Sequence, residues 1–283
     1  MYPTLLIDCP DQPGIVQAVT RFLYEAGVNI VRLDQHASEP VGGHYFMRLE
    51  FATANQSDTE AHLADFQTKV AQHYAMRWQL YWPEPKPKVA VLCSKTSHTL
   101  LELLHLNSQG KLGGVVTKVI SNHETLRTLV ESYNLPFHHV AIDKTSESKQ
   151  ASEAQILKLT EGDDLLVMAR YMQILSDDFV SHWPLKIINI HHSFLPAFVG
   201  ADPYRQAFDK GVKLIGATAH YATAELDQGP IIEQDVARFS HRESLSELRN
   251  LGQDVERAVL ARAVRWHLER RIILHNNKTI VFR

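Results

Sequence analysis

A proline-rich segment from Trp82 to Lys88 limits most strongly how this chain can fold. Prolines occupy positions 83, 85 and 87 and alternate with charged residues. Proline lacks an N–H, fixes φ and keeps the preceding residue out of the helical region, so this segment favours neither a helix nor a central strand. We therefore expect a stiff linker over residues 83–88, between one domain over residues 1–82 and another over residues 89–283.

Before the linker, the hydrophobic pattern changes its period several times. Ile15, Val19 and Phe22 recur at helical spacing and Gly27 ends that helix, whereas the segments on either side of a Gly42-Gly43 turn alternate like strands. The expected elements are strand 5–8, a helix from residue 15, strands 29–37 and 44–51, helix 62–74 and strand 76–81. This βαββαβ order is that of a ferredoxin-like domain.

After the linker, short apolar segments alternate with helical ones. The expected strands cover residues 89–93, 117–121, 137–142, 165–169, 187–191, 215–221 and 231–236, and the expected helices cover 99–106, 124–133, 153–159 and 245–270. A terminal edge strand is expected over 279–282. Continuously apolar strands between helices are typical of a parallel sheet that is covered on both faces. The second domain is therefore predicted to be a doubly wound, Rossmann-like α/β domain with a mostly parallel sheet.

The composition is that of an ordinary globular protein with no special partner. Hydrophobic residues make up 45% of the chain, charged residues make up 22%, and the formal net charge is −3. A nucleic-acid-binding surface needs a basic excess, and a membrane helix needs an apolar run of about 18 residues, so we expect neither partner. Cys9 and Cys93 each follow an apolar run and no basic segment precedes the first strand. Buried thiols in the cytoplasm are the expectation.

Polar residues that suit acyl chemistry follow two of the expected strands. Asn189 and His191 alternate at a strand end and so share one face, and Asp227 lies in a turn before Gly229 and Pro230. An amide and an imidazole can stabilise an oxyanion, and a carboxylate can position water, so no serine or cysteine nucleophile is required. A polar strand end and an ordinary turn would give the same patterns. Spacing alone therefore leaves open whether these residues are catalytic or only structural. The adjacent histidines lack a spaced third ligand, so no metal site is predicted.

The same segments resemble the two motifs of the formyltetrahydrofolate-dependent formyltransferase superfamily. The first motif is Asn189-Ile190-His191-His192-Ser193-Phe194-Leu195-Pro196, followed by Ala197-Phe198-Val199-Gly200-Ala201, and the second is Glu225-Leu226-Asp227-Gln228-Gly229-Pro230. The resemblance covers nearly all of residues 88–283 and implies that Asn189, His191 and Asp227 are catalytic. It also implies a pterin pocket around two segments, with Met172, Ile174, Leu175, Ala222, Glu225 and Leu226 as substrate-binding residues. Plain core packing is the alternative for Met172, Ile174 and Leu175, and for Leu175 it explains the residue as well as substrate binding does.

Within the superfamily, the chain most resembles the formyltetrahydrofolate deformylase branch. Residues 193–198, 216–221 and 261–267 are typical of that branch, whose members carry an N-terminal ACT domain. Residues 11–16 resemble the ACT turn and helix, and residues 27–30 resemble its next strand. The resemblance implies hydrolysis of 10-formyltetrahydrofolate, which is a substrate, and no cofactor. It also implies a homo-oligomer, such as a tetramer, and an amino-acid effector, glycine or methionine, near Asp11, Gly14 and Asn29. A purely dimerising ACT domain is the alternative.

Two other functions fit the same site. A formyltransferase would pass the formyl group to an amine, but the loop at residues 93–98 lacks the glycines of a phosphate cradle. Ser94, Lys95 and Ser97 could still bind an anion there. A non-catalytic folate-binding regulator would need none of the three catalytic residues, all of which are present. Asp202 replaces an asparagine that is common in relatives, and the identity of the general base, Asp227 or His191, is left open.

Overall fold

The computed structural model describes residues 2–143, 145–196 and 203–283, and the chain divides into two compact units. The first unit contains Met1–Pro85, Arg270–His275 and Ile280–Arg283, and the second contains Lys86–Glu269 and Asn276–Thr279. Residues 197–201 of the first motif, and Asp202, lie outside the described residues.

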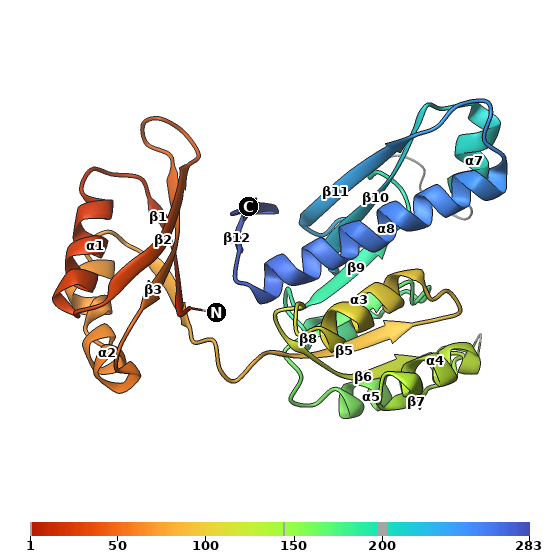
Figure 1. The fold of residues 1–283 in the computed structure, drawn as a ribbon, viewed down its shortest axis with the longest axis horizontal. Helices are drawn as coiled ribbons and strands as arrows, with labels where there is room; N and C mark the ends of the chain where they lie inside the picture. The colour runs from red at the N-terminus through yellow and green to blue at the C-terminus, as the bar shows by residue number, and fades with distance from the viewer. Residues whose placement is uncertain (1, 144, 197–202) are drawn as a thin grey trace. The chain divides into compact units, whose positions relative to one another are not determined.

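The first unit has a four-stranded antiparallel sheet in the order β2-β3-β1-β4. Its strands are β1 (Thr4–Pro10), β2 (Asn29–Ala37), β3 (His44–Ala52) and β4 (Arg77–Tyr81). Its helices are α1 (Ile15–Glu25) and α2 (Gln56–Leu63), and a π-helical turn covers Gln67–Ala71. The helices cover one face of the sheet (Figure 1). The main core of this unit includes Leu5, Phe22, Leu49 and Phe66.

The helix α2 begins earlier than the sequence pattern predicts. Residues 56–60 are polar and give no hydrophobic period, but Asn55 caps the helix because its side chain accepts hydrogen bonds from the backbone N–H groups of Ser57 and Asp58. The predicted helix over 62–74 is therefore the end of α2 followed by the π-helical turn. The cap, rather than an apolar face, sets the start of this helix.

The C-terminal segment forms a separate hairpin instead of the edge strand predicted over 279–282. Strands β12 (Ile272–His275) and β13 (Lys278–Val281) pair only with each other among the described strands. Asn276 adopts a left-handed conformation with φ 55°, which allows the tight turn between them. The apolar residues Ile273 and Phe282 pack with Leu6 and Phe46 of the first unit.

The second unit has a seven-stranded sheet in the order β11-β10-β9-β8-β5-β6-β7. The central strands are β5 (Lys88–Cys93), β6 (Val115–Ser121), β7 (Phe137–His139), β8 (Leu165–Ala169) and β9 (Ile187–His191), and all are parallel. The strands β10 (Leu214–Tyr221) and β11 (Ile231–Arg238) extend the sheet in antiparallel fashion. The predicted α/β fold class, with a mostly parallel second sheet, is therefore confirmed.

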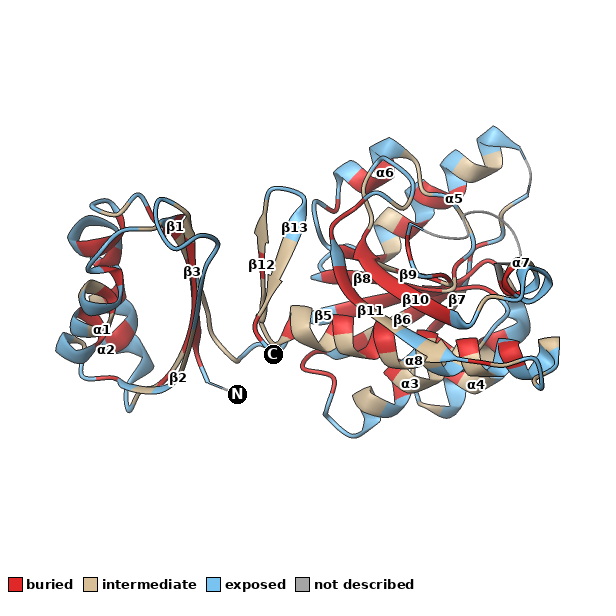
Figure 2. Ribbon diagram, turned by 90° about the horizontal axis from the view of Figure 1, so that it is seen from above, coloured by how far each residue is buried: buried red, intermediate tan, exposed pale blue. Residues whose placement is uncertain are grey.

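Helices cover both faces of this sheet (Figure 2). The helices α3 (His98–Ser108), α4 (Arg127–Ser132) and α8 (Leu245–Leu268) lie on one face, and α5 (Ser146–Leu159) and α6 (Asp177–Ser181) lie on the other. A short helix α7 (Pro203–Lys210) packs against α8. The chain runs from β5 outward to β7 and then returns to β8 on the other side of β5. The carboxyl ends of β5 and β8 therefore form a topological switch point, where ligands of such sheets bind.

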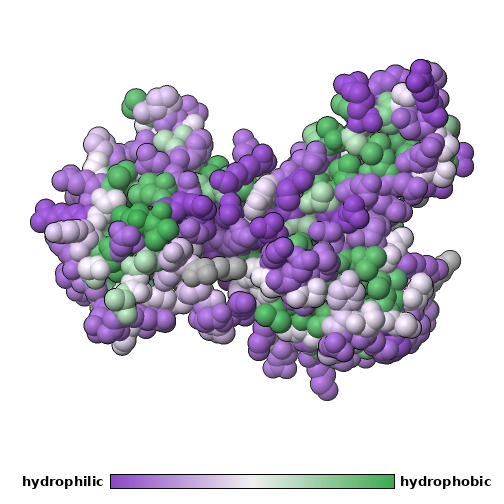
Figure 3. Space-filling view, viewed as in Figure 1, coloured by the Kyte–Doolittle hydropathy of each residue, from purple (hydrophilic) through white to green (hydrophobic). Residues whose placement is uncertain are grey.

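The surface shown in Figure 3 mixes hydrophilic residues with scattered apolar ones on each unit. Among the described residues, no helix combines the length and the apolar character that a membrane span requires.

Candidate active site

A cavity of about 570 Å³ opens at the carboxyl ends of β8 and β9 and is also lined by residues of α8 and of the loop after β10. Asn189, His191 and Asp227 all line it. The structure therefore brings the three residues from two separate segments into one cavity. On β9, Asn189 and His191 alternate with Ile188, which is buried in the sheet, and with Ile190, which is buried and also lines the cavity.

Asp227 lies between two imidazoles. Its Oδ2 is 3.2 Å from His191 Nδ1, and its Oδ1 is 3.5 Å from His220 Nε2. The hydrogen bond from His191 holds the pKa of Asp227 well below its usual range, although burial opposes this shift. Asp227 is therefore a carboxylate at neutral pH.

The loop that carries Asp227 is tightly constrained. Asp227 itself has φ 56°, a left-handed conformation that is strained for a residue with a Cβ. A Cβ at Gly229 would lie 1.7 Å from the carbonyl oxygen of Tyr221, so only glycine fits there. Asn277 Nδ2 donates a hydrogen bond to Gln228 O at 3.1 Å and supports the loop from its outer side. These contacts fix the direction of the Asp227 side chain.

The contact with Asp227 also sets the state of His191. The Nδ1–H faces the carboxylate, which leaves the lone pair of Nε2 as the reactive site of the neutral ring. His191 is buried, and its Nε2 has no hydrogen-bond partner. This arrangement of a carboxylate and an imidazole is that of an oriented general base.

His220 is a member of the site that the residue pattern did not single out. It lies directly opposite Asn189 in the β9–β10 register and is 2% exposed. Its Nδ1 is 3.0 Å from the carbonyl oxygen of Tyr221, which can only accept, so Nδ1 carries the proton. Asn189 Nδ2 donates to His220 Nε2 at 3.2 Å, which leaves the second N–H of the amide for another acceptor.

His192 belongs to the same wall of the cavity but is not poised for proton transfer. Its ring stacks on that of His191 with centroids 5.3 Å apart. Burial, and then the charge of Arg170, lower the pKa of His192 to about 4. His192 is therefore uncharged at neutral pH and packs against the imidazole of His191.

A buried glutamate on α8 organises the polar part of the cavity. Glu256 is 1% exposed, and its Oε2 lies 2.8 Å from His98 Nε2 and 3.5 Å from Arg170 Nη1. Tyr204 donates a hydrogen bond to Oε1, and Gly252, one turn earlier, makes room for the tyrosine ring. Burial alone would raise the pKa of Glu256, but the hydrogen bond from His98 and the charge of Arg170 outweigh it, so the pKa is lowered. The sequence pattern did not reveal this cluster.

The residues predicted to bind the pterin lie mostly at the rim of this cavity. Met172, Ile174, Leu175, Ala222 and Leu226 line it, whereas Glu225 is not among the lining residues. Met172, Ile174 and Leu226 are 60%, 62% and 57% exposed, so plain core packing does not explain them. Glu225 instead supports the loop through its backbone, since its carbonyl oxygen accepts hydrogen bonds from Thr223 Oγ1 and from the backbone N–H of Gln228.

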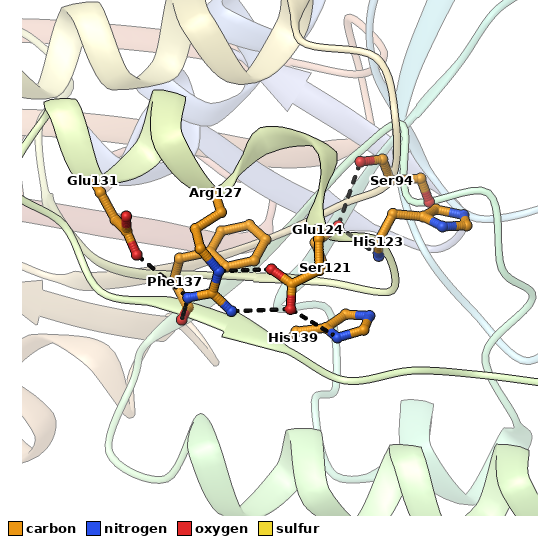
Figure 4. Close-up of polar contacts among 8 residues, drawn as sticks. All are labelled: Ser94, Ser121, His123, Glu124, Arg127, Glu131, Phe137 and His139. Atoms are coloured by element: carbon orange, nitrogen blue, oxygen red, sulfur yellow. Dashed lines mark hydrogen bonds and ion pairs between the residues drawn. The ribbon is translucent and has the colours of Figure 1, made fainter.

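The loop after β5 is closed by internal hydrogen bonds. Ser94 Oγ lies 2.6 Å from Asn122 Oδ1 and also contacts the carbonyl oxygen of Tyr171. Ser121 Oγ donates to Ser94 O and accepts from the backbone N–H of His123, as the close-up of these strand ends shows (Figure 4). Ser94 is thus engaged inside the protein, which disfavours the anion site considered for this loop.

One cavity of the first unit is lined by one of the three residues predicted to bind an effector. Gly14 lines a cavity of about 370 Å³ with residues such as Gln17, Arg21 and Tyr74, but neither Asp11 nor Asn29 lines it. Gly14 has φ 96°, which explains the glycine at the start of α1.

Two family models match the chain. The formyl transferase model matches residues 87–264, and the ACT domain model matches residues 3–65. A formyltetrahydrofolate deformylase of Bacillus subtilis is 50% identical over 98% of this chain and 93% of its own length. The chain belongs to the formyltetrahydrofolate deformylase family. The family resemblance of the two motifs, and the expected ACT and formyltransferase domains, are thereby confirmed.

Other members of this family are similar over the same extent. A formyltetrahydrofolate deformylase of Synechocystis is 45% identical over 99% of this chain and 98% of its own length. The crystal structure of a formyltetrahydrofolate deformylase from Pseudomonas syringae matches with a TM-score of 0.91 and 42% identity, and covers 100% of this chain and 94% of that one. Both domains of this chain are therefore shared with deformylases.

Proposed function

We propose that this chain hydrolyses 10-formyltetrahydrofolate to formate and tetrahydrofolate, and so supplies formate for purine synthesis and balances one-carbon pools. The observation that carries the proposal is the pairing of His191 with Asp227 beside Asn189 in one cavity. These groups suit attack by water on a formyl carbon and need no covalent intermediate. The full-length likeness to deformylases supports the same reaction.

The folate enters with its pterin ring against the apolar rim. Met172, Ile174 and Leu226 offer exposed apolar surface, and a flat heteroaromatic ring that covers it removes that surface from water. This binding places the formyl group on N10 near Asn189 and His191.

His191 Nε2 accepts the proton of the attacking water, and Asp227 orients the imidazole. Both oxygens of Asp227 face imidazole nitrogens, and its lowered pKa makes it a weak base. The unpartnered Nε2 of His191 is the better acceptor. The adjacent carboxylate then stabilises the imidazolium that forms.

Asn189 stabilises the negative charge that develops on the formyl oxygen. One N–H of its amide is used by His220, and the other is available for the oxyanion. The water oxygen becomes part of formate, the C–N10 bond breaks, and the imidazolium returns a proton to N10. His220 acts as a positioning residue because its Nε2 accepts a hydrogen bond from Asn189.

The runner-up function, transfer of the formyl group to an amine, uses the same residues. A simple assay distinguishes it from hydrolysis. The full-length chain is given 10-formyltetrahydrofolate as sole substrate, and formate and tetrahydrofolate are both quantified. Equal amounts of the two products support hydrolysis. Turnover only after addition of an amine supports a transferase, and folate binding without any turnover supports a regulator.

The ACT domain binds an amino-acid effector, glycine or methionine, and assembles the chain as a homo-oligomer such as a tetramer. The cavity beside Gly14 supports a small-molecule site in this unit. Titration calorimetry with each amino acid at millimolar concentration tests the effector, and analytical ultracentrifugation tests the assembly. No heat of binding with either amino acid leaves only the assembly role.

A further inference from the structure

Arg170 places a guanidinium on the wall of the catalytic cavity with few partners. Its side chain is 15% exposed, and its Nε and Nη1 are buried without a hydrogen-bond partner. Its one ion pair among the described residues joins Nη1 to Glu256 at 3.5 Å. A guanidinium presents five N–H donors, and unmatched donors in a partly buried site are unfavourable. Arg170 also lines the cavity, so an acceptor small enough to reach the guanidinium there would offset this cost.

The backbone at this position is also unfavourable for an arginine. Arg170 follows β8 with φ 62°, and Met172 has φ 58°, so two left-handed residues flank Tyr171 at the edge of the cavity. Glycine would adopt φ 62° without strain, whereas any residue with a Cβ is strained there. The loop itself thus gives no reason for an arginine, which points to a function of the side chain.

The groups that surround Arg170 leave its positive charge available to an anion in the cavity. Glu256 already accepts hydrogen bonds from His98 and Tyr204, so its negative charge is compensated from two other sides. His192, on the side of the catalytic pair, has a pKa of about 4 and is uncharged at neutral pH. Neither neighbour occupies the guanidinium with a hydrogen bond.

We propose that Arg170 binds the formate product as it leaves the catalytic pair. The inference rests on the proposed hydrolysis, in which water and the formyl group yield a formate anion and the C–N10 bond breaks. A carboxylate of three heavy atoms accepts two parallel hydrogen bonds from a guanidinium fork. Arg170, His191 and His192 line the same cavity, and the ring of His192 stacks on that of His191. The subsite takes small monocarboxylates.

Binding of formate to the full-length chain tests this subsite directly. The broadening of the ¹³C-formate NMR signal gives a dissociation constant at constant ionic strength, without folate. We expect binding to weaken about tenfold in Arg170→Gln and Arg170→Gly, and less in Arg170→Lys, which keeps the charge but loses the fork. Arg257→Gln is the matched control, because Arg257 pairs with Asp254 and does not line the cavity. It should bind formate like the unmodified chain.

The glycine variant separates a binding role from a structural one. Arg170→Gly relaxes the backbone while it removes the guanidinium, so a normal melting temperature with weakened formate binding supports the subsite. Equal formate binding by all variants, or none by the unmodified chain, overturns it. Formate release from 10-formyltetrahydrofolate, assayed in the same preparations, allows the formate subsite and the proposed hydrolysis to be tested separately. If the chain turns over its substrate but its formate binding does not depend on Arg170, the subsite alone is overturned. If formate binding depends on Arg170 but no turnover occurs, the proposed hydrolysis alone is overturned.

Discussion

Asp227 Oδ2 lies 3.2 Å from His191 Nδ1, while the Nε2 on the far side of the same ring has no hydrogen-bond partner. The carboxylate thereby fixes one tautomer of the imidazole and directs its lone pair away from the loop. In the proposed hydrolysis the two residues therefore have different tasks. Asp227 orients the imidazole, and His191 Nε2 accepts the proton of the attacking water.

Replacement of Asp227 by Asn should remove the orienting charge and retain the shape of the side chain. An amide at this position can donate to His191 Nδ1 and so favours the wrong tautomer, and we expect kcat to fall about 10³-fold or more. Folate binding should persist, because Asp227 contributes little to the apolar rim. Stopped-time formate assays and equilibrium folate binding measure the two quantities. Asp209→Asn, at an exposed site on α7, is the control.

Replacement of Asn189 by Ala should slow the reaction without weakening substrate binding. Loss of one preorganised donor to an oxyanion costs about 10²–10³ in kcat, because the donor acts mainly in the transition state. The Michaelis constant should change little. Asn250→Ala, on the exposed face of α8, should behave like the unmodified chain. A rise in the Michaelis constant at constant kcat would instead place Asn189 in ground-state binding.

The neutral state of His192 predicts how stability depends on pH. Its pKa is lowered to about 4, below the ordinary value of 6.5, so the unfolded chain binds more protons between these two values. Stability is therefore retained above about pH 6.5 and falls as the pH drops toward 4, with a slope of up to about 1.4 kcal/mol per unit. Urea midpoints between pH 4.5 and 7.5 should show a smaller loss for His192→Gln. The same slope in both proteins would contradict the prediction.

A substitution on α8 tests the packing behind the polar cluster. Alanine normally stabilises a helix interior relative to glycine by about 1 kcal/mol. At Gly252, however, a new Cβ would lie 2.2 Å from the ring of Tyr204, which is held by Glu256. We expect Gly252→Ala to destabilise the chain by about 1–3 kcal/mol and to lower activity. Thermal unfolding measures the first effect, and an increase in the melting temperature would show that Tyr204 moves freely.

Much of the fold could be predicted because its signals are local. The prolines at 83, 85 and 87, the apolar strands and the helical spacing of Ile15, Val19 and Phe22 each act within a few residues. The terminal strand forms close to the predicted residues, as β13, but it pairs with β12 in a separate hairpin. Pairing partners are a non-local choice, and the residues around Asn276 fold back on their neighbours. The start of α2 was missed because a polar helix held by its cap has no hydrophobic period.

The site was predictable only where its residues fall in contiguous segments. Asn189 and His191 alternate on one strand, and Asp227 lies beside turn residues, so their chemistry is visible in the sequence. His220, Arg170 and Glu256 lie in three other segments, and only the sheet register and the packing of α8 bring them to the same cavity. Their sequence neighbours are ordinary strand, turn and helix residues, which gives no local sign of a shared role.

The origin of the second oxygen of formate is the most direct measure of the central claim that His191 and Asp227 activate water. The full-length chain is incubated with 10-formyltetrahydrofolate in H₂¹⁸O, and the formate is analysed by mass spectrometry after a short reaction. We expect one ¹⁸O atom in each formate released, at a rate that falls about 10³-fold or more in Asp227→Asn. Unlabelled formate, or labelled formate at an undiminished rate in that variant, would contradict it.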